Sequence, residues 1–269
     1  MSTDWLTVAE GSARLIVAFP HTGTDIPADI EARMVSPWLA RKDADWWVDR
    51  LYDFAAELGA TTVRTGISRS VIDVNRDPSG ASLYPGMATT GLCPTETFDG
   101  EPLYRPGQEP TEAEIAERRA TWFDPYHAVI QTQIERLGAD RPVVLYDAHS
   151  IRSVVPRLFD GELPLFNIGD NNGVTCAPEL TRAVEAACGP SQVTNGRFKG
   201  GWTTRHYGQP ATGVHAIQME LADRGYILDP AGGVSEANWP SPYEPERAEP
   251  MREHLRAVLT ACTAFAGNA

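Results

Sequence analysis

The stretch Pro142-Val-Val-Leu-Tyr-Asp-Ala-His-Ser150 joins a continuous apolar run to a group of polar residues. Its β-branched and aromatic side chains predict a strand buried on both faces, with Asp147 and His149 at its end. The stretch Arg14-Leu-Ile-Val-Ala-Phe19 has the same character and is followed closely by His21. Two such runs indicate parallel strands of an α/β sheet, because helices on both faces of that sheet bury both sides of each strand.

The rest of the chain alternates predicted helices with predicted strands. Helices are predicted over residues 43–58, 111–137, 177–187 and 249–265, and further strands over residues 61–64, 70–74 and 214–220. Local signals mark the helix ends: Asp43 is a predicted N-cap, Gly59 a C-cap, Thr111-Glu-Ala-Glu114 a capping box, and Pro250 suits a first turn. Residues 79–110 are rich in Gly, Pro, Thr and Tyr, which predicts a long ordered loop of the kind that often covers a site.

This order of elements predicts one α/β domain over residues 1–269, with a three-layer architecture in which a mostly parallel sheet is flanked by helices. Ligands of such folds bind outside the carboxyl ends of the strands. His21, His149 and Glu220 all lie at or near predicted strand ends. We therefore expect them to meet at one edge of the sheet.

Composition excludes several classes of partner. The net charge is −13, from 23 Lys and Arg against 36 Asp and Glu, so nucleic acid is not an expected partner. An anionic small-molecule substrate would need a local group of arginines within this acidic chain. No segment is apolar enough to span a membrane, and residues 1–11 do not resemble a secretory signal, so we expect a cytoplasmic protein. The four cysteines form no CxxC pair and are expected to be reduced thiols.

Two histidines that follow buried strands, each near an acidic residue, indicate a metal site. Catalytic zinc takes three protein ligands and keeps one position for water, so His21 and His149 need a third partner. Asp45 is the preferred third ligand and Asp25 the alternative. Asp45 also suits the first turn of its predicted helix, where acidic residues are common. Asp147 fits a position behind His149 better than a place among the ligands.

Glu220 is a carboxylate in an otherwise apolar strand, Val214-His-Ala-Ile-Gln-Met-Glu220. Such a group costs free energy unless it is paired or functional. Two interpretations are open. One is a salt bridge to Arg224; the other is a general base beside the metal, with a pKa raised by burial.

Several arginines could recognise a carboxylate, because the guanidinium fork binds carboxylates bidentately. Arg76 follows Asn75 at the exit of a predicted strand, and Arg152 comes three residues after His149. Arg205 lies in the glycine-flanked loop 200–208, which could be a lid or a surface turn. The alternative for these arginines is a set of surface ion pairs.

Taken together, several short motifs resemble those of the N-formylglutamate amidohydrolases. They are Pro20-His-Thr-Gly-Thr-Asp-Ile-Pro27, Asp45-Trp-Trp-Val-Asp-Arg-Leu-Tyr-Asp-Phe54, Ser68-Arg69, Asp73-Val-Asn-Arg76, Leu103-Tyr-Arg-Pro-Gly-Gln108, Asp147-Ala-His-Ser150 and Gln218-Met-Glu220. The resemblance runs from about residue 12 to residue 230. It implies a branch of the zinc carboxypeptidase and aspartoacylase architecture, with a mixed sheet and the metal at the strand ends. It also implies a place in bacterial histidine catabolism.

The resemblance assigns roles to individual residues. His21 and His149 match the two histidine ligands of the relatives, but Thr24 stands where those relatives have a ligating glutamate. The Asn75-Arg76 pair resembles the pair that binds substrate carboxylate. Arg69 resembles the arginine that polarises the scissile carbonyl, and Glu220 matches the general base.

The expected reaction is hydrolysis of N-formyl-L-glutamate to formate and L-glutamate with Zn²⁺ or another divalent ion. Glu220 and Arg69 would be catalytic, and Asn75, Arg76, Arg152 and Arg205 would bind the substrate. Two alternatives remain open. One is a hydrolase of another N-acyl acidic amino acid. The other is an inactive protein of the same fold that binds a metal or a carboxylate.

Overall fold

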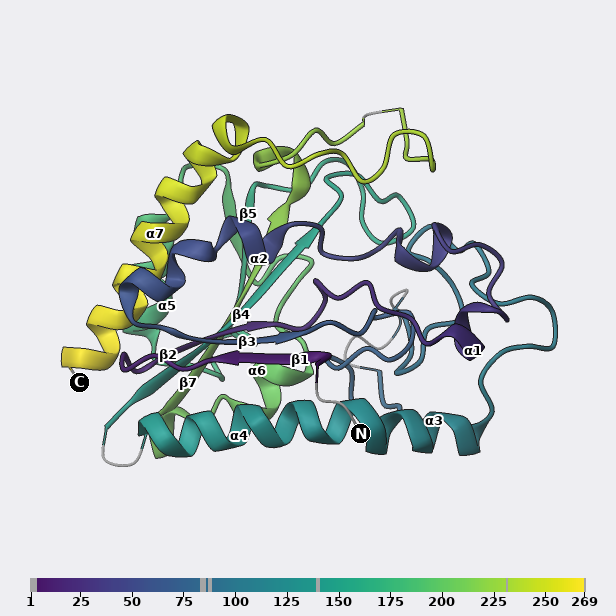
Figure 1. The fold of residues 1–269 in the computed structure, drawn as a ribbon. Helices are drawn as coiled ribbons and strands as arrows, with labels where there is room; N and C mark the ends of the chain where they lie inside the picture. Colours follow the sequence, from purple (N-terminus) through teal and green to yellow (C-terminus); the bar gives the residue numbers. More distant parts are fainter. Residues whose placement is uncertain (1–3, 83–85, 87–88, 139–140, 231, 269) are drawn as a thin grey trace.

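A mixed sheet of seven strands, in the order β1-β3-β2-β4-β7-β5-β6, runs through the middle of the computed structural model (Figure 1). The structure describes residues 4–82, 86, 89–138, 141–230 and 232–268. The strands are β1 (Leu6–Ala9), β2 (Leu15–Phe19), β3 (Thr61–Thr65), β4 (Val143–Ile151), β5 (Phe166–Gly169), β6 (Gln192–Thr194) and β7 (Val214–Ala222). Neighbours among β3, β2, β4 and β7 pair in parallel, whereas β1 runs antiparallel to β3 and β5 antiparallel to β7. The expected mostly parallel sheet flanked by helices is confirmed.

Helices cover both faces of the sheet (Figure 1). The longer helices are α3 (Glu112–Arg118), α4 (Asp124–Gly138), α5 (Pro178–Ala187), α6 (Trp202–Tyr207) and α7 (Pro245–Asn268). A π-helical turn, η3 (Arg119–Phe123), joins α3 to α4. The short helical segments are α1 (Ala28–Glu31), η1 (Leu39–Arg41), α2 (Val48–Leu51), η2 (Asp53–Leu58), η4 (Pro210–Thr212) and η5 (Asp223–Gly225). No helix among the described residues is both long and apolar enough to cross a bilayer.

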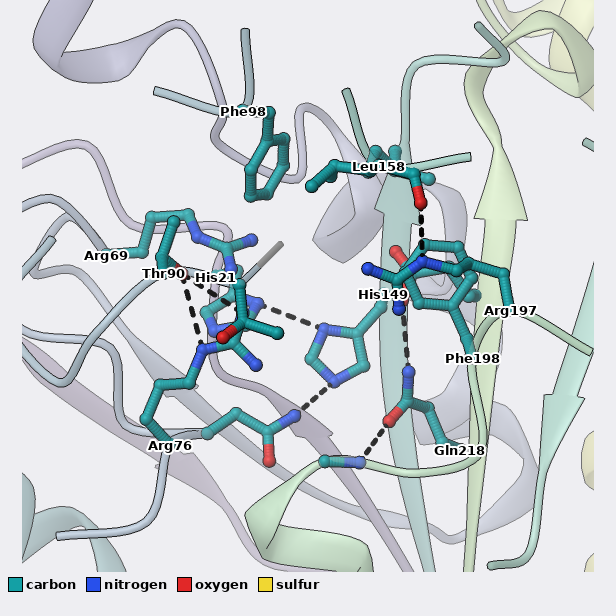
Figure 2. A pocket seen from close by; sticks show the side chains of 15 residues that line it. His21, Arg69, Arg76, Thr90, Phe98, His149, Leu158, Arg197, Phe198 and Gln218 are labelled. Atoms are coloured by element: carbon teal, nitrogen blue, oxygen red, sulfur yellow. Dashed lines mark hydrogen bonds between the residues drawn. The ribbon is translucent and has the colours of Figure 1, made fainter. Parts of the chain in front are cut away.

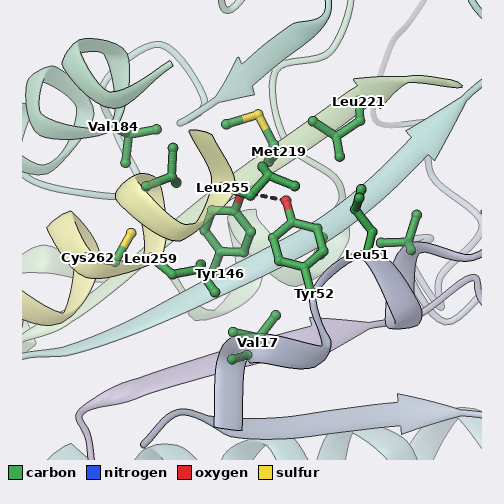
Figure 3. Packing of buried hydrophobic residues seen from close by; sticks show 14 of the residues in the cluster. Val17, Leu51, Tyr52, Tyr146, Val184, Met219, Leu221, Leu255, Leu259 and Cys262 are labelled. Atoms are coloured by element: carbon green, nitrogen blue, oxygen red, sulfur yellow. Dashed lines mark hydrogen bonds between the residues drawn. The ribbon is translucent and has the colours of Figure 1, made fainter. Parts of the chain in front are cut away.

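Alternate residues of the central strands enter two different cores. Val143 and Leu145 of β4 pack in the cluster that includes Tyr126 and Ile130 of α4. Val144 and Tyr146 pack on the opposite side, in the cluster that includes α7. Figure 3 shows this second core, where the hydroxyls of Tyr52 and Tyr146 lie 2.8 Å apart among aliphatic side chains. The continuous apolar run of β4 is therefore explained by burial on both faces.

The helix predicted over residues 43–58 is wrong in its first third. Only α2 and η2 are helical, and Trp47, at the N-cap position of α2, has a positive φ of 65°. Asp43 is not an N-cap, because its Oδ2 accepts from the backbone N of Phe98 at 2.6 Å. The acidic side chains of this segment are engaged elsewhere, which leaves residues 43–47 in turns. Gly59 does end the segment with the expected left-handed conformation.

The strand predicted over residues 70–74 is absent. This segment is a turn in which Ser68 Oγ accepts from the N of Ser70 at 3.2 Å and Asp73 Oδ1 accepts from the N of Asn75 at 2.9 Å. Side-chain acceptors of this kind compete with sheet pairing for the backbone N–H groups. The β-branched Val71 and Ile72 are buried against α4 all the same. Their side chains fit a core, while the backbone follows the turn.

Other element boundaries also differ from expectation. β4 extends to Ile151, so Asp147 and His149 lie inside the strand and not beyond it. α7 begins at Pro245, which leaves Pro250 inside the helix. Residues 202–207 form α6, with Thr203 and Thr204 buried, so this segment is not a plain surface turn. The described part of 79–110 contains no helix or strand, as expected for a long loop.

Candidate functional site

A cavity of about 60 Å³ lies at the carboxyl ends of β2, β4 and β7 (Figure 2). The sheet contributes His149 and Ile151 from β4, Gln218 and Glu220 from β7, and His21 from just beyond β2. Loops close the remaining sides. A cavity of this kind suits a small-molecule ligand.

Three ligand-type atoms converge beside this cavity. His149 Nδ1 lies 3.1 Å from His21 Nδ1 and 3.1 Å from Asp45 Oδ2, and His21 Nδ1 lies 3.6 Å from Asp45 Oδ2. Tetrahedral zinc with bonds of about 2.0–2.1 Å holds its ligand atoms about 3.3–3.4 Å apart. All three residues are buried, and together they could hold a metal ion. Asp25, the alternative third ligand, is exposed and lies outside this group.

The far nitrogen of each histidine ring faces a carboxylate. His21 Nε2 lies 2.7 Å from Asp73 Oδ1, and His149 Nε2 lies 3.0 Å from Asp147 Oδ2. A neutral imidazole that donates from Nε2 carries its lone pair on Nδ1. In that tautomer the Nδ1 atoms of both rings, which lie 3.1 and 3.6 Å from Asp45 Oδ2, are available to a metal ion. This carboxylate–histidine arrangement is the one that orients metal-binding histidines, and it gives Asp147 the place behind His149 expected from the sequence.

Arg69 links the carboxylates of this group. Its Nη1 donates to Asp45 Oδ1 at 3.2 Å and its Nη2 to Asp73 Oδ2 at 2.9 Å, while its guanidinium lies 4.8 Å from the centre of the Phe98 ring. Burial raises the pKa of Asp45 and Asp73, but their contacts with the histidines and, for Asp73, the charges of Arg69 and Arg76 outweigh this effect and hold the pKa of both carboxyls below the usual range. The group is thus an acidic cluster balanced by positive charge.

Glu220 projects into the cavity beside His149. The two residues are register partners on the paired strands β4 and β7, so their side chains leave the sheet on the same face. Burial raises the pKa of Glu220 to about 7, with Asp45 adding to the effect and His149 opposing it. Its Oε2 accepts from Gln218 Nε2 at 3.0 Å. The salt bridge to Arg224 is not formed, because Arg224 Nε pairs with Glu162 at 3.2 Å.

Asn75 joins the histidine cluster to the start of α6. Its Nδ2 donates to Asp147 Oδ2 at 2.9 Å and lies 2.9 Å from His149 Nε2, and its Oδ1 accepts from Thr203 N at 2.8 Å. Gly201 packs on the same amide, where a Cβ would come within 2.4 Å of Asn75 Nδ2. The amide of Asn75 is thus hydrogen-bonded at both ends inside the protein, and Asn75 also lines the cavity. Its expected contact with a substrate carboxylate stays a prediction.

The predicted substrate arginines separate into two groups. Arg76 lines the cavity, and its Nε and Nη2 donate to Thr90 Oγ1 at 3.3 and 3.1 Å. Arg152 and Arg205 do not line it. Arg152 Nη2 bonds to Asp43 at 3.3 Å and to Asp99 at 2.8 Å, so it braces the segment that carries Phe98. Arg205 Nε donates to Gly200 O at 2.9 Å.

Sequence reasoning missed part of the cavity wall. Arg197 and Phe198 line the cavity from the loop between β6 and α6, and Phe98, Thr90 and Leu158 line it from other loops. None of these residues belongs to a strand-end motif. In the sequence, Arg197 stands just before the glycine pair at residues 200 and 201, and the backbone there passes close to Asn75. That glycine pair is the feature of the sequence that could have indicated a place for Arg197 near the site.

A model of the N-formylglutamate amidohydrolase family matches residues 13–227. The chain belongs to this family. It is 44% identical over 265 residues to the N-formylglutamate deformylase of Pseudomonas aeruginosa, a match that covers 97% of this chain and 96% of that relative. It is 40% identical to the N-formylglutamate deformylase of Pseudomonas putida, with the same coverage.

Two solved structures share the fold of this chain. The crystal structure of N-formylglutamate amidohydrolase from Ralstonia eutropha JMP134 superposes with a TM-score of 0.80 at 24% identity, over 98% of each chain. A gene product of Agrobacterium tumefaciens superposes with a TM-score of 0.68 at 20% identity, over 97% of this chain and 95% of that one. The resemblance drawn from the short motifs is thus confirmed at the level of family and fold.

Proposed function

We propose that this protein hydrolyses N-formyl-L-glutamate to formate and L-glutamate, with a divalent ion bound by His21, Asp45 and His149. The observation that carries the proposal is the meeting of these three buried ligands with Glu220 at one small cavity. Identity of 44% to a curated N-formylglutamate deformylase supports the choice of substrate. The same substrate would give the protein a step in the breakdown of histidine.

The residues present fit a zinc ion. Both histidine rings are oriented by carboxylates, and the separations of 3.1, 3.1 and 3.6 Å between ligand atoms match a tetrahedral site with one position left over. A bound zinc ion supplies Lewis acidity, which polarises a carbonyl and lowers the pKa of a water to about 7.

Glu220 is the proposed general base. A carboxylate with a pKa near 7 is half ionised at neutral pH, which suits proton transfer in both directions. Glu220 would take the proton of the attacking water and return it to the nitrogen that leaves with glutamate. Gln218 holds the carboxylate in place through its bond to Oε2.

Arg69 and Arg76 are the proposed substrate contacts on the side of Asp73. A guanidinium carries five N–H donors, and among the described residues the carboxylates of Asp45 and Asp73 engage two of those of Arg69. Arg69 can therefore also donate to the oxygen of the formyl group as negative charge develops there. Arg76, whose Nε lies 3.4 Å from Asp73 Oδ2, would bind the α-carboxylate of the substrate.

The test is formate release from N-formyl-L-glutamate by one preparation as purified, after chelation, and after zinc is restored. We expect activity to disappear on chelation and to return with zinc. Activity that survives complete removal of metal would refute the zinc proposal and keep the substrate. Accumulation of N-formylglutamate from histidine in cells that lack the protein would check the pathway.

N-acetyl-L-glutamate is the comparison substrate for the alternative of a broader N-acyl amino acid hydrolase. A specific deformylase should turn over the formyl substrate in preference to the acetyl one. Equal values of kcat/KM for the two substrates would contradict deformylation as the specific reaction. Absence of turnover with either substrate would favour the alternative of an inactive binding protein.

A further inference from the structure

Three arginines line the cavity, and they differ in what holds them. Arg69 is bound to two carboxylates of the histidine cluster, and Arg76 lies 3.4 Å from one of these, Asp73. Among the described residues, Arg197 is held by loop groups. Its Nε donates to Leu158 O at 2.7 Å, and its guanidinium lies 5.3 Å from the centre of the Phe198 ring.

Arg76 and Arg197 enter the cavity from opposite sides, with His149 between them (Figure 2). A ligand that lies across the histidines therefore has a guanidinium at each end. The anchor at Nε and the contact with Phe198 fix the plane of Arg197, while the fork of its two terminal nitrogens is the part that binds a carboxylate bidentately.

The loop that carries Arg197 is tied to the sheet on both sides of the residue. Asn195 N donates to Ile168 O of β5 at 2.7 Å, and Gly201 N donates to Gln218 Oε1 of β7 at 2.6 Å. Gln218 in turn bonds to Glu220. The position of Arg197 is thus set relative to the proposed general base, so a carboxylate bound there lies at a fixed distance from the reacting amide.

We propose that Arg197 is the specificity-determining residue that binds the side-chain carboxylate of the substrate. This inference rests on the proposed function. The α-carboxylate is attached to the carbon that bears the amide nitrogen, so it must lie near the histidine cluster, where Arg76 is held. The side-chain carboxylate is at the far end of a flexible chain and reaches the opposite wall. Of the described residues that line the cavity, Arg197 is the arginine on that wall, whereas Arg152 and Arg205 do not line the cavity.

The test compares N-formyl-L-glutamate with N-formyl-L-glutamine, which keeps the shape and loses the side-chain charge. The parent protein should prefer the glutamate derivative by roughly 10- to 100-fold in kcat/KM, the range expected for hydrogen bonds to a charged group. Arg197→Gln should lose about this factor with N-formylglutamate and change little with N-formylglutamine. Arg197→Lys keeps the charge without the fork, so its kcat/KM with N-formylglutamate should lie between those of the parent and of Arg197→Gln.

Arg182→Gln is the matched control, because it removes one positive charge from an exposed position on α5 that pairs only with Glu179 among the described residues. This variant should keep the parent preference. A parent protein that does not distinguish the two substrates would overturn the inference. So would an Arg197→Gln protein that retains the preference, or one that loses activity equally with both substrates.

Binding of the product separates this inference from the proposed reaction. Calorimetry with L-glutamate and L-glutamine needs no turnover, so it applies even if formate is never released. If the parent is inactive but binds L-glutamate more tightly than L-glutamine, and Arg197→Gln removes the difference, the proposed function fails and the assignment of Arg197 stands. Equal affinities of the parent for both amino acids would refute the assignment.

Discussion

On one side of the cavity, next to the ends of the strands, lie His21, Asp45 and His149 with exposures of 4%, 1% and 2%, and on the other side loops hold Phe98, Leu158 and Arg197. The first side is a closed network of charged groups in which each ring nitrogen has a defined partner. The second side consists of apolar side chains and an arginine anchored on a backbone carbonyl. This difference matches the roles proposed above, in which the sheet side carries the residues for hydrolysis and the loop side carries the residue that selects the substrate.

Glu220→Gln gives the largest expected effect and tests the sheet side. The amide keeps the shape but cannot take a proton, so kcat should fall by roughly 10²–10⁴-fold with little change in KM. Steady-state kinetics with N-formyl-L-glutamate measures this, and the metal content of the variant should match that of the parent. A variant as active as the parent would remove Glu220 from the chemistry.

Asp73→Asn should weaken metal binding without removing a ligand. The carboxylate of Asp73 orients His21 through a contact of 2.7 Å, and loss of such a partner typically costs about 10–100-fold in metal affinity. Competition with a chromophoric chelator measures the affinity directly. Phe98→Ala, on the loop side, is the control and should leave metal affinity unchanged. Equal losses of metal affinity in the two variants would contradict the separate roles of the sheet side and the loop side.

Ionisation of Glu220 should govern how kcat/KM changes with pH on the acidic side. Burial raises the pKa of this group to about 7, and a general base works only when ionised, so kcat/KM should rise with pH and then level off. A bound cation favours the ionised form of Glu220 and so lowers its pKa, which puts the midpoint of this rise at or below about pH 7. Below the pKa of Glu220, kcat/KM should rise about tenfold per pH unit. A profile that stays flat down to pH 4 would contradict this role of Glu220.

Phe98→Ala should produce the smallest change in rate and the clearest change in selectivity. Phe98 stacks on Arg69 at the cavity wall, so its removal enlarges the space near the acyl group. The preference for N-formyl over N-acetyl-L-glutamate should narrow by about 10-fold, as expected for one added carbon in a pocket. Relative kcat/KM for the two substrates is the measurement. An unchanged ratio would exclude Phe98 from the acyl side of the cavity.

The sheet side was largely predictable from the sequence. His21 follows β2, and His149 and Glu220 lie near the carboxyl ends of β4 and β7. The continuous apolar runs of β2 and the first part of β4 indicate burial on both faces of a parallel sheet. Strand ends of one parallel sheet meet at one edge, so three residues far apart in the chain could be placed together. Asp45 could be proposed as a ligand, but its helix could not be predicted correctly, because its carboxylate binds His149 and Arg69.

The loop side was not predictable for a physical reason. Arg197 is positioned by the carbonyl of Leu158 and the ring of Phe198, and long-range backbone acceptors leave no periodic pattern in a sequence. Short strands such as β5 and β6 also escaped prediction, because three or four residues carry too little pattern. At residues 70–74 a strand was predicted where the structure has a turn. The β-branched residues of this segment favour a strand, but local hydrogen bonds prevent it.

The register of β4 and β7 sets His149 and Glu220 side by side, one strand spacing apart. That spacing, about 4.8 Å, is imposed by backbone hydrogen bonds and does not depend on which side chains surround the pair. Evolution or engineering could therefore exchange the loops around Phe98 and Arg197 while His149 and Glu220 keep their relative geometry. A library restricted to those loops is accordingly a direct route to hydrolases for other acylated amino acids, with the sheet kept as an unaltered template.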